Sequence, residues 1–178
     1  MENQRIRLSK AMLKSALLNL LSEKPLNQIT VHEICRTAEI NRTTFYKYYG
    51  SQFDLLEEIQ KDFFTRLDEN LKNIGSSNPD ALLDVLKYLH TQRGTFCILV
   101  NAMPDRAFAE QLFSISAVGF LFKSRIDDHY SAMQAKYIKL FVFQGAYAII
   151  RDWLSSREPE PAAEIAQILH ALRDKLLP

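Results

Sequence analysis

Residues 30–49 hold two short helical patterns separated by a tight turn, and this pairing constrains the fold more than any other part of the chain. The hydroxyl of Thr30 is spaced to cap the first helix while Glu33 reaches back, which is the spacing of a capping box. Apolar residues then recur at helical spacing and predict a buried stripe: Val31, Ile34, Cys35 and Ala38.

The second helix of this pair, residues 41–49, has an unusual outward face. Asn41 is a good N-cap, and Phe45 at its fourth position is expected to face the core. The residues left to face outward are Arg42, Thr43, Thr44, Tyr46, Lys47 and Tyr48. An ordinary surface helix more often carries Glu and Lys pairs. These side chains instead offer base-edge hydrogen bonds, methyl contacts and phosphate neutralisation, a pattern typical of a DNA-reading helix-turn-helix.

The run from Ala38 to Tyr49, followed by Ser51 and by Asp54-Leu55-Leu56, resembles the DNA-binding domain of the TetR family of bacterial transcriptional regulators. The resemblance covers residues 5–60. It implies that helix 41–49 enters the major groove and that Tyr46 contacts the DNA backbone or a base. Carried over by position, the candidate base readers are Arg42, Thr43, Thr44 and Tyr48, and the candidate phosphate contacts are Lys47 and Thr30.

Two residues depart from the family pattern. Glu39 stands where the turn usually has Gly, so this turn either carries mild backbone strain or has a different shape. Gln52 stands where a Lys usually approaches a phosphate, so one charge contact is expected to be missing. Neither change removes the predicted reading helix.

Charge is distributed unevenly along the chain. Residues 1–50 contain eight basic and four acidic residues, a net charge of +4, which leaves −3 for residues 51–178 in a chain of net charge +1. A basic end on a mildly acidic body suits a protein of which one end approaches DNA. Arg7, Lys10 and Lys14 share one flank of the first predicted helix, 5–22; this flank is either a solvated face or a rim that meets phosphates.

Helical periodicity continues along the rest of the chain, and strand patterns are nearly absent, so the predicted fold class is all-α. Ser51 to Asp54 has capping-box spacing and starts a long connector helix to about residue 72. Further helices are expected at 80–90, 96–101 and 107–125. We predict a DNA-binding domain of three helices at residues 1–50 and a helical effector-binding and dimerisation domain at residues 51–178.

The stretch 135–154 is apolar around nearly its whole circumference, which predicts burial on every side. In so small a body, one of those sides has to be covered by another subunit. The last helix repeats apolar residues on one face: Ile165, Ile168, Leu169, Leu172 and Leu176. Residues 135–178 are therefore predicted to form a helical hairpin that pairs with its own copy, and the family resemblance implies the same homodimer.

An apolar effector pocket in the body is a further expectation from the resemblance. The candidate lining residues are Phe96, Phe113, Phe120, Tyr137 and Phe141, drawn from a larger aromatic set that adds Phe122, Tyr130 and Tyr147. Aromatics at helical spacing are more often core. Four polar residues near the apolar helices either orient a ligand or are solvent-exposed or capping: Gln92, Arg93, Gln144 and Arg151.

Several classes of function lack sequence support. The histidines His32, His90, His129 and His170 have no metal spacing, and Cys35 and Cys97 form no C-x-x-C pair, so no metal or other cofactor is expected. Phosphate-binding loops and nucleophile elbows are absent, which argues against an enzyme. No apolar run reaches a membrane span and no secretory signal is visible, so a bacterial cytoplasmic location is expected.

These observations together predict a homodimeric DNA-binding regulator. The first hypothesis is a repressor released from a palindromic operator by a small apolar or aromatic effector. The alternative from another class is an adaptor or coactivator on the same scaffold, regulated by a protein partner in place of a small ligand. An enzyme is a third and more distant reading.

Overall fold

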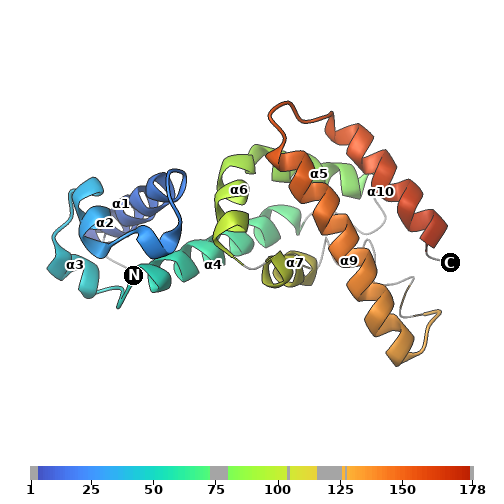
Figure 1. The fold of residues 1–178 in the computed structure, drawn as a ribbon, viewed down its shortest axis with the longest axis horizontal. Coiled ribbons are helices and arrows are strands. Elements are labelled where there is room, and N and C mark those ends of the chain that lie inside the picture. The colour runs from blue at the N-terminus through green and yellow to red at the C-terminus, as the bar shows by residue number, and fades with distance from the viewer. Residues whose placement is uncertain (1–3, 73–79, 104, 116–125, 127, 177–178) are drawn as a thin grey trace. The chain divides into compact units, whose positions relative to one another are not determined.

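The computed structural model describes residues 4–72, 80–103, 105–115, 126 and 128–176, and within these ranges the regular elements are helices without any strand (Figure 1). The all-α prediction is therefore confirmed. No helix within the described ranges has both the length and the apolar character needed to cross a membrane. The elements are α1 (Gln4–Leu21), η1 (Leu26–Gln28), α2 (Val31–Thr37), α3 (Arg42–Tyr46), α4 (Gln52–Leu71), α5 (Ala81–Thr91), α6 (Arg93–Ala102), α7 (Asp105–Ser114), α9 (Ala132–Ser155) and α10 (Ala162–Leu176).

The chain divides into two compact units, Met1–Phe63 and Phe64–Pro178, and the division falls inside α4. By compactness, the first part of α4 belongs with α1, α2 and α3. The predicted boundary between residues 50 and 51 concerns the division of function and stays a prediction.

The core of the N-terminal unit is made by the apolar faces of its four helices. The side chains with no exposed surface are Leu13, Leu17, Ile34, Phe45 and Leu55. Helix α1 packs on α2, and α2 packs on α3. The first helix ends at Leu21, one residue before the predicted end, and Pro25 follows before η1. This packing fixes the orientation of α3 from its buried side.

Helix α4 begins with a modified form of the predicted capping box. The Asp54 N–H donates to the Ser51 hydroxyl oxygen at 3.4 Å, as expected for the first half of the box. The Asp54 carboxylate accepts from the N–H of Gly50 at 2.9 Å and not from that of Ser51. A Cβ at position 50 would lie 2.9 Å from this carboxylate oxygen, so the close approach favours Gly.

In the C-terminal unit, the structure corrects two predicted helices. Helix α6 begins at Arg93 and includes Gly94, so only Gln92 separates it from α5. Helix α7 ends at Ser114, and Ile115 lies beyond it. The rest of the predicted helix 107–125 lies outside the described residues.

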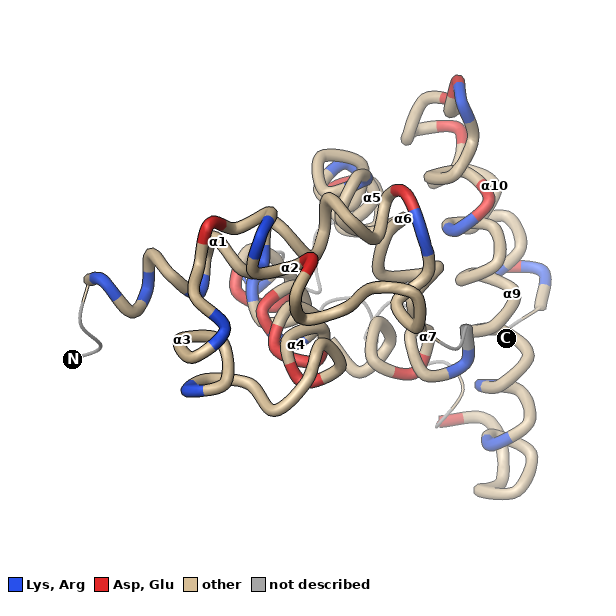
Figure 2. The backbone as a smooth tube through the Cα atoms, turned by 60° about the vertical axis from the view of Figure 1, so that its left-hand side comes forward, with Lys and Arg blue, Asp and Glu red and all other residues tan. Residues whose placement is uncertain are grey.

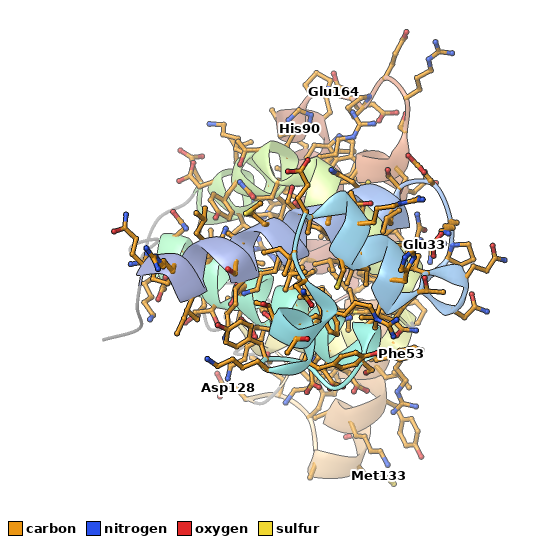
Figure 3. All side chains as sticks on the ribbon, turned by 90° about the vertical axis from the view of Figure 1, so that its left-hand side faces the viewer. Glu33, Phe53, His90, Asp128, Met133 and Glu164 are labelled. Carbon is orange, nitrogen blue, oxygen red and sulfur yellow. The ribbon has the colours of Figure 1, made fainter. Side chains whose placement is uncertain are left out.

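Helix α9 starts with a complete capping box between Ser131 and Gln134. Its burial within one chain is one-sided, and the covering of its other side by another subunit stays a prediction. The buried residues are Ala135, Val142, Ala146, Tyr147, Ile150, Trp153 and Leu154. The exposed large apolar residues are Met133, Tyr137, Leu140 and Phe141, of which Met133 is labelled in Figure 3. Helix α10 packs on α5 and α9.

Candidate nucleic-acid interface

The turn between α2 and α3 is a Schellman motif with a glutamate at the left-handed position. The N–H of Ile40 donates to the Cys35 carbonyl at 2.9 Å, and the N–H of Glu39 donates to the Arg36 carbonyl at 3.2 Å. Glu39 has φ of 53° and is the one described non-glycine residue with positive φ. The turn thus keeps the shape that Gly would favour, and of the two predicted outcomes the strained one holds.

Both helices of the pair are capped as predicted. Thr30 and Glu33 form a complete capping box at the start of α2. The side-chain oxygen of Asn41 accepts from the Thr43 N–H at 2.9 Å at the start of α3. Of the predicted stripe on α2, Ile34, Cys35 and Ala38 are buried, whereas Val31 is partly exposed.

Helix α3 is shorter than predicted. It ends at Tyr46, and Lys47 to Tyr49 continue as a turn in which the N–H groups of Tyr48 and Tyr49 both donate to the Phe45 carbonyl at 2.9 Å. The Phe45 side chain is fully buried, with its ring centroid 5.5 Å from the rings of Tyr46 and Tyr49. Phe45 therefore anchors the short helix from below.

The structure brings the six outward residues predicted for DNA contact onto this one segment. Arg42, Thr43, Tyr46 and Lys47 are exposed, and Tyr46 keeps 51% of its surface. Thr44 and Tyr48 are partly buried. The arrangement offers a guanidinium, hydroxyls, a phenol and an ammonium group over a short span, which suits contacts to base edges and phosphates.

Thr30, which with Lys47 was predicted to contact phosphates, uses its hydroxyl within the capping box. The hydroxyl accepts from the Glu33 N–H at 3.2 Å and lies 2.9 Å from the Glu33 carboxylate, to which it donates. The Nζ atom of Lys24 lies 2.6 Å from the same carboxylate. The hydrogen bond from Lys24, followed by those from Thr30, lowers the pKa of Glu33 to about 2. A phosphate at Thr30 would approach beside this ionised group.

The basic flank of α1 faces a set of carboxylates that the sequence analysis missed. The Nζ atom of Lys14 lies 2.7 Å from Glu58 and 2.7 Å from Asp62, and the Nζ atom of Lys10 lies 3.6 Å from Glu58. Figure 2 shows the basic residues on α1 and the acidic residues along α4. Lys14 therefore has neither of the two roles expected for this flank, a solvated side chain or a contact to phosphate. The spacing of four in both pairs, 10 and 14 against 58 and 62, was the available signal.

The aromatic residues predicted for an effector pocket fall into different environments. Phe96 is fully buried, and its ring packs edge-on against that of Phe108 at a centroid distance of 5.1 Å. Phe108 also contacts the rings of Phe64 and Tyr147, at 5.1 and 5.9 Å. Phe96 is thus part of an aromatic cluster in the interior of the C-terminal unit.

The other pocket candidates do not join this cluster as a group. Phe113 is buried and stacks on Phe143 with the centroids 4.6 Å apart. Tyr137 and Phe141 are 61% and 68% exposed, so they lie on the outside of the single chain. Phe120 lies outside the described residues, as does Phe122. The pocket itself stays a prediction.

Arg93 was expected to orient a ligand or else to be solvent-exposed or capping. In the structure it caps a helix. Its Nε donates to the Leu154 carbonyl at 2.6 Å, and its guanidinium also donates to the Ser156 carbonyl. These carbonyls lie in the last turn of α9 and at its C-cap, where the helix supplies no further N–H donors. Nearby, the Trp153 indole donates to the Glu160 carbonyl at 2.8 Å, and its ring stacks on that of His90. In the part of the chain that is described, no three His, Cys, Asp or Glu residues gather as metal ligands would.

Curated relatives with substantial matches are transcription regulators. The chain is 24% identical over 167 residues to YxbF of Bacillus subtilis (strain 168), an uncharacterised HTH-type transcriptional regulator, covering 89% of this chain and 43% of the relative. It is 34% identical over 83 residues to DhaS of Lactococcus lactis subsp. lactis (strain IL1403), an HTH-type transcriptional activator of the dhaKLM operon, covering 46% of this chain and 43% of the relative. The chain thus matches less than half the length of either relative.

A solved structure shares the fold. The crystal structure of a TetR transcriptional regulator from Streptococcus agalactiae 2603V has a TM-score of 0.72 and 21% identity, with 95% of each chain covered. Two family models also match: bacterial regulatory proteins of the tetR family over residues 13–59, and the transcriptional regulator C-terminal region TetR_C_8 over residues 77–175. The second match alone spans more than half of the chain. The chain therefore belongs to the TetR family of bacterial transcriptional regulators.

Proposed function

We propose that this chain acts as a homodimeric transcription regulator in the bacterial cytoplasm and that each copy places the segment 42–48 in a major groove of operator DNA. TetR regulators are DNA-binding proteins and not enzymes, so no reaction is assigned. The observation that carries the proposal is the capped helix α3, which presents Arg42, Thr43, Tyr46 and Lys47 outward over the buried Phe45.

The roles within this segment follow from reach and charge. Arg42 at the first position of α3 can bond two acceptors of a guanine in the major groove. Thr43, Thr44 and Tyr48 can read further base edges, while Lys47, Tyr46 and Thr30 contact the backbone. A two-fold dimer would place the two segments in half-sites about 34 Å apart, or a multiple of that distance.

The proposed dimer interface is formed by α9 and α10. Tyr137, Leu140 and Phe141 follow one another at helical spacing on the exposed side of α9 and remain 45–68% exposed. Ile168, Leu172 and Leu176 on α10 remain 40–49% exposed. Covering these large apolar side chains with the same helices of a second copy would form an isologous four-helix interface.

The proposed mode of control is release from the operator when a small apolar or aromatic effector enters the C-terminal unit. The support is the aromatic interior around Phe96, Phe108 and Tyr147, where a repacked ring could admit a ligand.

The similarity to DhaS, an activator, favours activation as the second candidate. In that version, an adaptor or coactivator is controlled by a protein partner, and the exposed rings of Tyr137 and Phe141 support such a contact.

The experiment that tests the DNA-binding proposal is selection of duplexes from a random library by the purified chain, followed by affinity measurements on the recovered sequence. We expect an enriched sequence with two-fold symmetry. Arg42→Ala should weaken binding to it by about 1–3 kcal/mol and relax the preference at one base pair of each half-site.

The matched control is Arg106→Ala, which removes an exposed arginine of α7 paired with Glu110 within the same helix. This control should bind the selected duplex like the unsubstituted chain. Recovery of no preferred sequence would contradict the proposal. An equal loss by Arg42→Ala on every duplex would refute its role as a base reader.

A further inference from the structure

Lys10 of α1 lies among groups from two other parts of the N-terminal unit. Its Nζ atom is 5.7 Å from the ring centroid of Tyr48 and 5.9 Å from that of Tyr49. The same atom is 3.6 Å from a carboxylate oxygen of Glu58 on α4. The Lys10 side chain is 25% exposed, so its charge is largely directed at these groups.

These contacts meet at the point where the reading segment leaves helical geometry. The rings of Tyr48 and Tyr49 lie edge to face with centroids 6.4 Å apart, and Tyr49 is only 4% exposed. A cation within about 6 Å of an aromatic centroid attracts the ring face. Lys10 thereby contacts the ring of Tyr48, whose N–H donates to the carbonyl of Phe45 three residues back and not four.

The same residue is one of the three cations on the flank of α1, for which the sequence left open either a solvated face or a rim that meets phosphates. A phosphate contact requires a cation that is available at the surface, as Lys47 is. Lys10 instead has a carboxylate and two rings as neighbours. Its charge is therefore used inside the N-terminal unit, next to a candidate base reader.

We infer that Lys10 is a positioning residue for DNA reading: it orients the Tyr48 ring through its cation–π contact while Glu58 holds its ammonium group. The inference rests on the proposed function, because it assigns Tyr48 a contact with operator bases. The Nζ atom of Lys47 also lies 5.9 Å from the Tyr48 centroid, but Lys47 is exposed and is proposed to neutralise a phosphate directly. Lys10, which Glu58 holds, would be a specificity determinant on α1 without a DNA contact of its own.

The test uses the duplex selected by the unsubstituted full-length chain and measures affinity over a series of salt concentrations. Lys10→Met keeps the aliphatic stem but removes the charge, and we expect about a three- to tenfold loss of affinity. The slope of log affinity against log salt should stay unchanged. Lys47→Met is the comparison for a phosphate contact, and its slope should decrease by about 0.9. Lys61→Met removes an exposed lysine of α4 and should change neither quantity.

A double-mutant cycle then connects Lys10 to Tyr48. After Tyr48→Leu has removed the ring, Lys10→Met should cause little further loss, whereas a direct phosphate contact would give additive losses. Lys10→Arg keeps a cation over the ring and should restore most of the affinity. Thermal unfolding identifies any variant that fails to fold, and the Tyr48 ring resonances in NMR spectra should shift in Lys10→Met without DNA present.

The possible results distinguish failure of the positioning role of Lys10 from failure of the proposed DNA-binding function. A reduced salt slope in Lys10→Met, additive losses, or unshifted Tyr48 resonances would each overturn the positioning role while the DNA-binding function stands. Failure of the unsubstituted chain to select any sequence would overturn the proposed function and, with it, this inference.

Discussion

The Nζ atom of Lys14 on α1 lies 2.7 Å from a carboxylate oxygen of Glu58 on α4. Burial lowers the pKa of Lys14, but hydrogen bonds to Asp62 and Glu58 outweigh that effect and raise it. Burial likewise raises the pKa of Glu58, but the hydrogen bond and charge of Lys14, together with the charge of Lys10, lower it on balance. Both groups are therefore ionised near neutral pH and tie α1 to the start of the connector helix.

Lys14→Met should destabilise the N-terminal unit because it leaves Glu58 and Asp62 side by side without their shared cation. The expected loss in the free energy of unfolding is about 1–2 kcal/mol, between the values typical of exposed and buried ion pairs. Urea unfolding measures this loss. In a Glu58→Gln, Asp62→Asn background the same substitution should cost much less, and an equal cost in both backgrounds would contradict the ion-pair explanation.

Glu39→Gly should stabilise the chain. Glu39 has φ of 53° at the left-handed position of a Schellman motif, where a side chain is strained and Gly is not. After allowing for the greater freedom of Gly in the unfolded chain, the gain should be about 0.5–1 kcal/mol. Glu39→Ala is the control, since it removes the charge but keeps the Cβ. If Ala and Gly raised the midpoint of thermal unfolding equally, charge and not strain would be the cause.

The capping box at Glu33 should make stability depend on pH in the acidic range. The folded-state pKa of Glu33 is about 2, below the ordinary value of 4.5, with Lys24 as the first cause. A lowered folded pKa means that its contribution is fully present above pH 4.5 and is lost as the pH falls through about 2. Unfolding of the unsubstituted chain and of Glu33→Gln, followed against pH, should therefore show a difference that disappears toward pH 2.

Lys24→Met is the matched control for the pH dependence. Without the lysine, the folded-state pKa of Glu33 should move back toward 4.5, so the loss of stability on acidification should be smaller and should be complete at a higher pH. A pH profile of Lys24→Met identical to that of the unsubstituted chain would show that the ion pair has no part in it.

Charges placed on the exposed apolar side chains of α9 and α10 should yield monomers. Phe141→Asp with Ile168→Asp would place carboxylates in the proposed interface, where ionised groups are costly to bury. Sedimentation equilibrium should report a dimer for the unsubstituted chain and a folded monomer for the double variant, with helix content checked by circular dichroism. Leu8→Asp changes an exposed leucine of α1 and should remain dimeric. A dimeric double variant would exclude this interface.

Local chemistry explains why much of the helix-turn-helix in residues 30–49 could be predicted from the sequence. Caps at Thr30 and Asn41 depend on side chains that bond backbone groups two or three residues away, so sequence spacing is enough to locate them. The burial of Phe45 follows in the same way from helical periodicity. The left-handed turn at Glu39 was recognisable because it departs from a pattern that normally has Gly there.

The sequence by itself thus determined the all-α fold class, the caps of α2 and α3 and the side-chain chemistry that residues 42–48 present. Tertiary structure decided where charges and rings end up: Lys14 bonds to Glu58 and Asp62, Arg93 caps α9, and Phe141 lies outside while Phe96 lies inside. These outcomes depend on contacts between residues more than 40 positions apart, or on which face of an apolar helix a neighbouring element covers. Periodicity records the apolar faces of a helix but not which neighbour covers each of them.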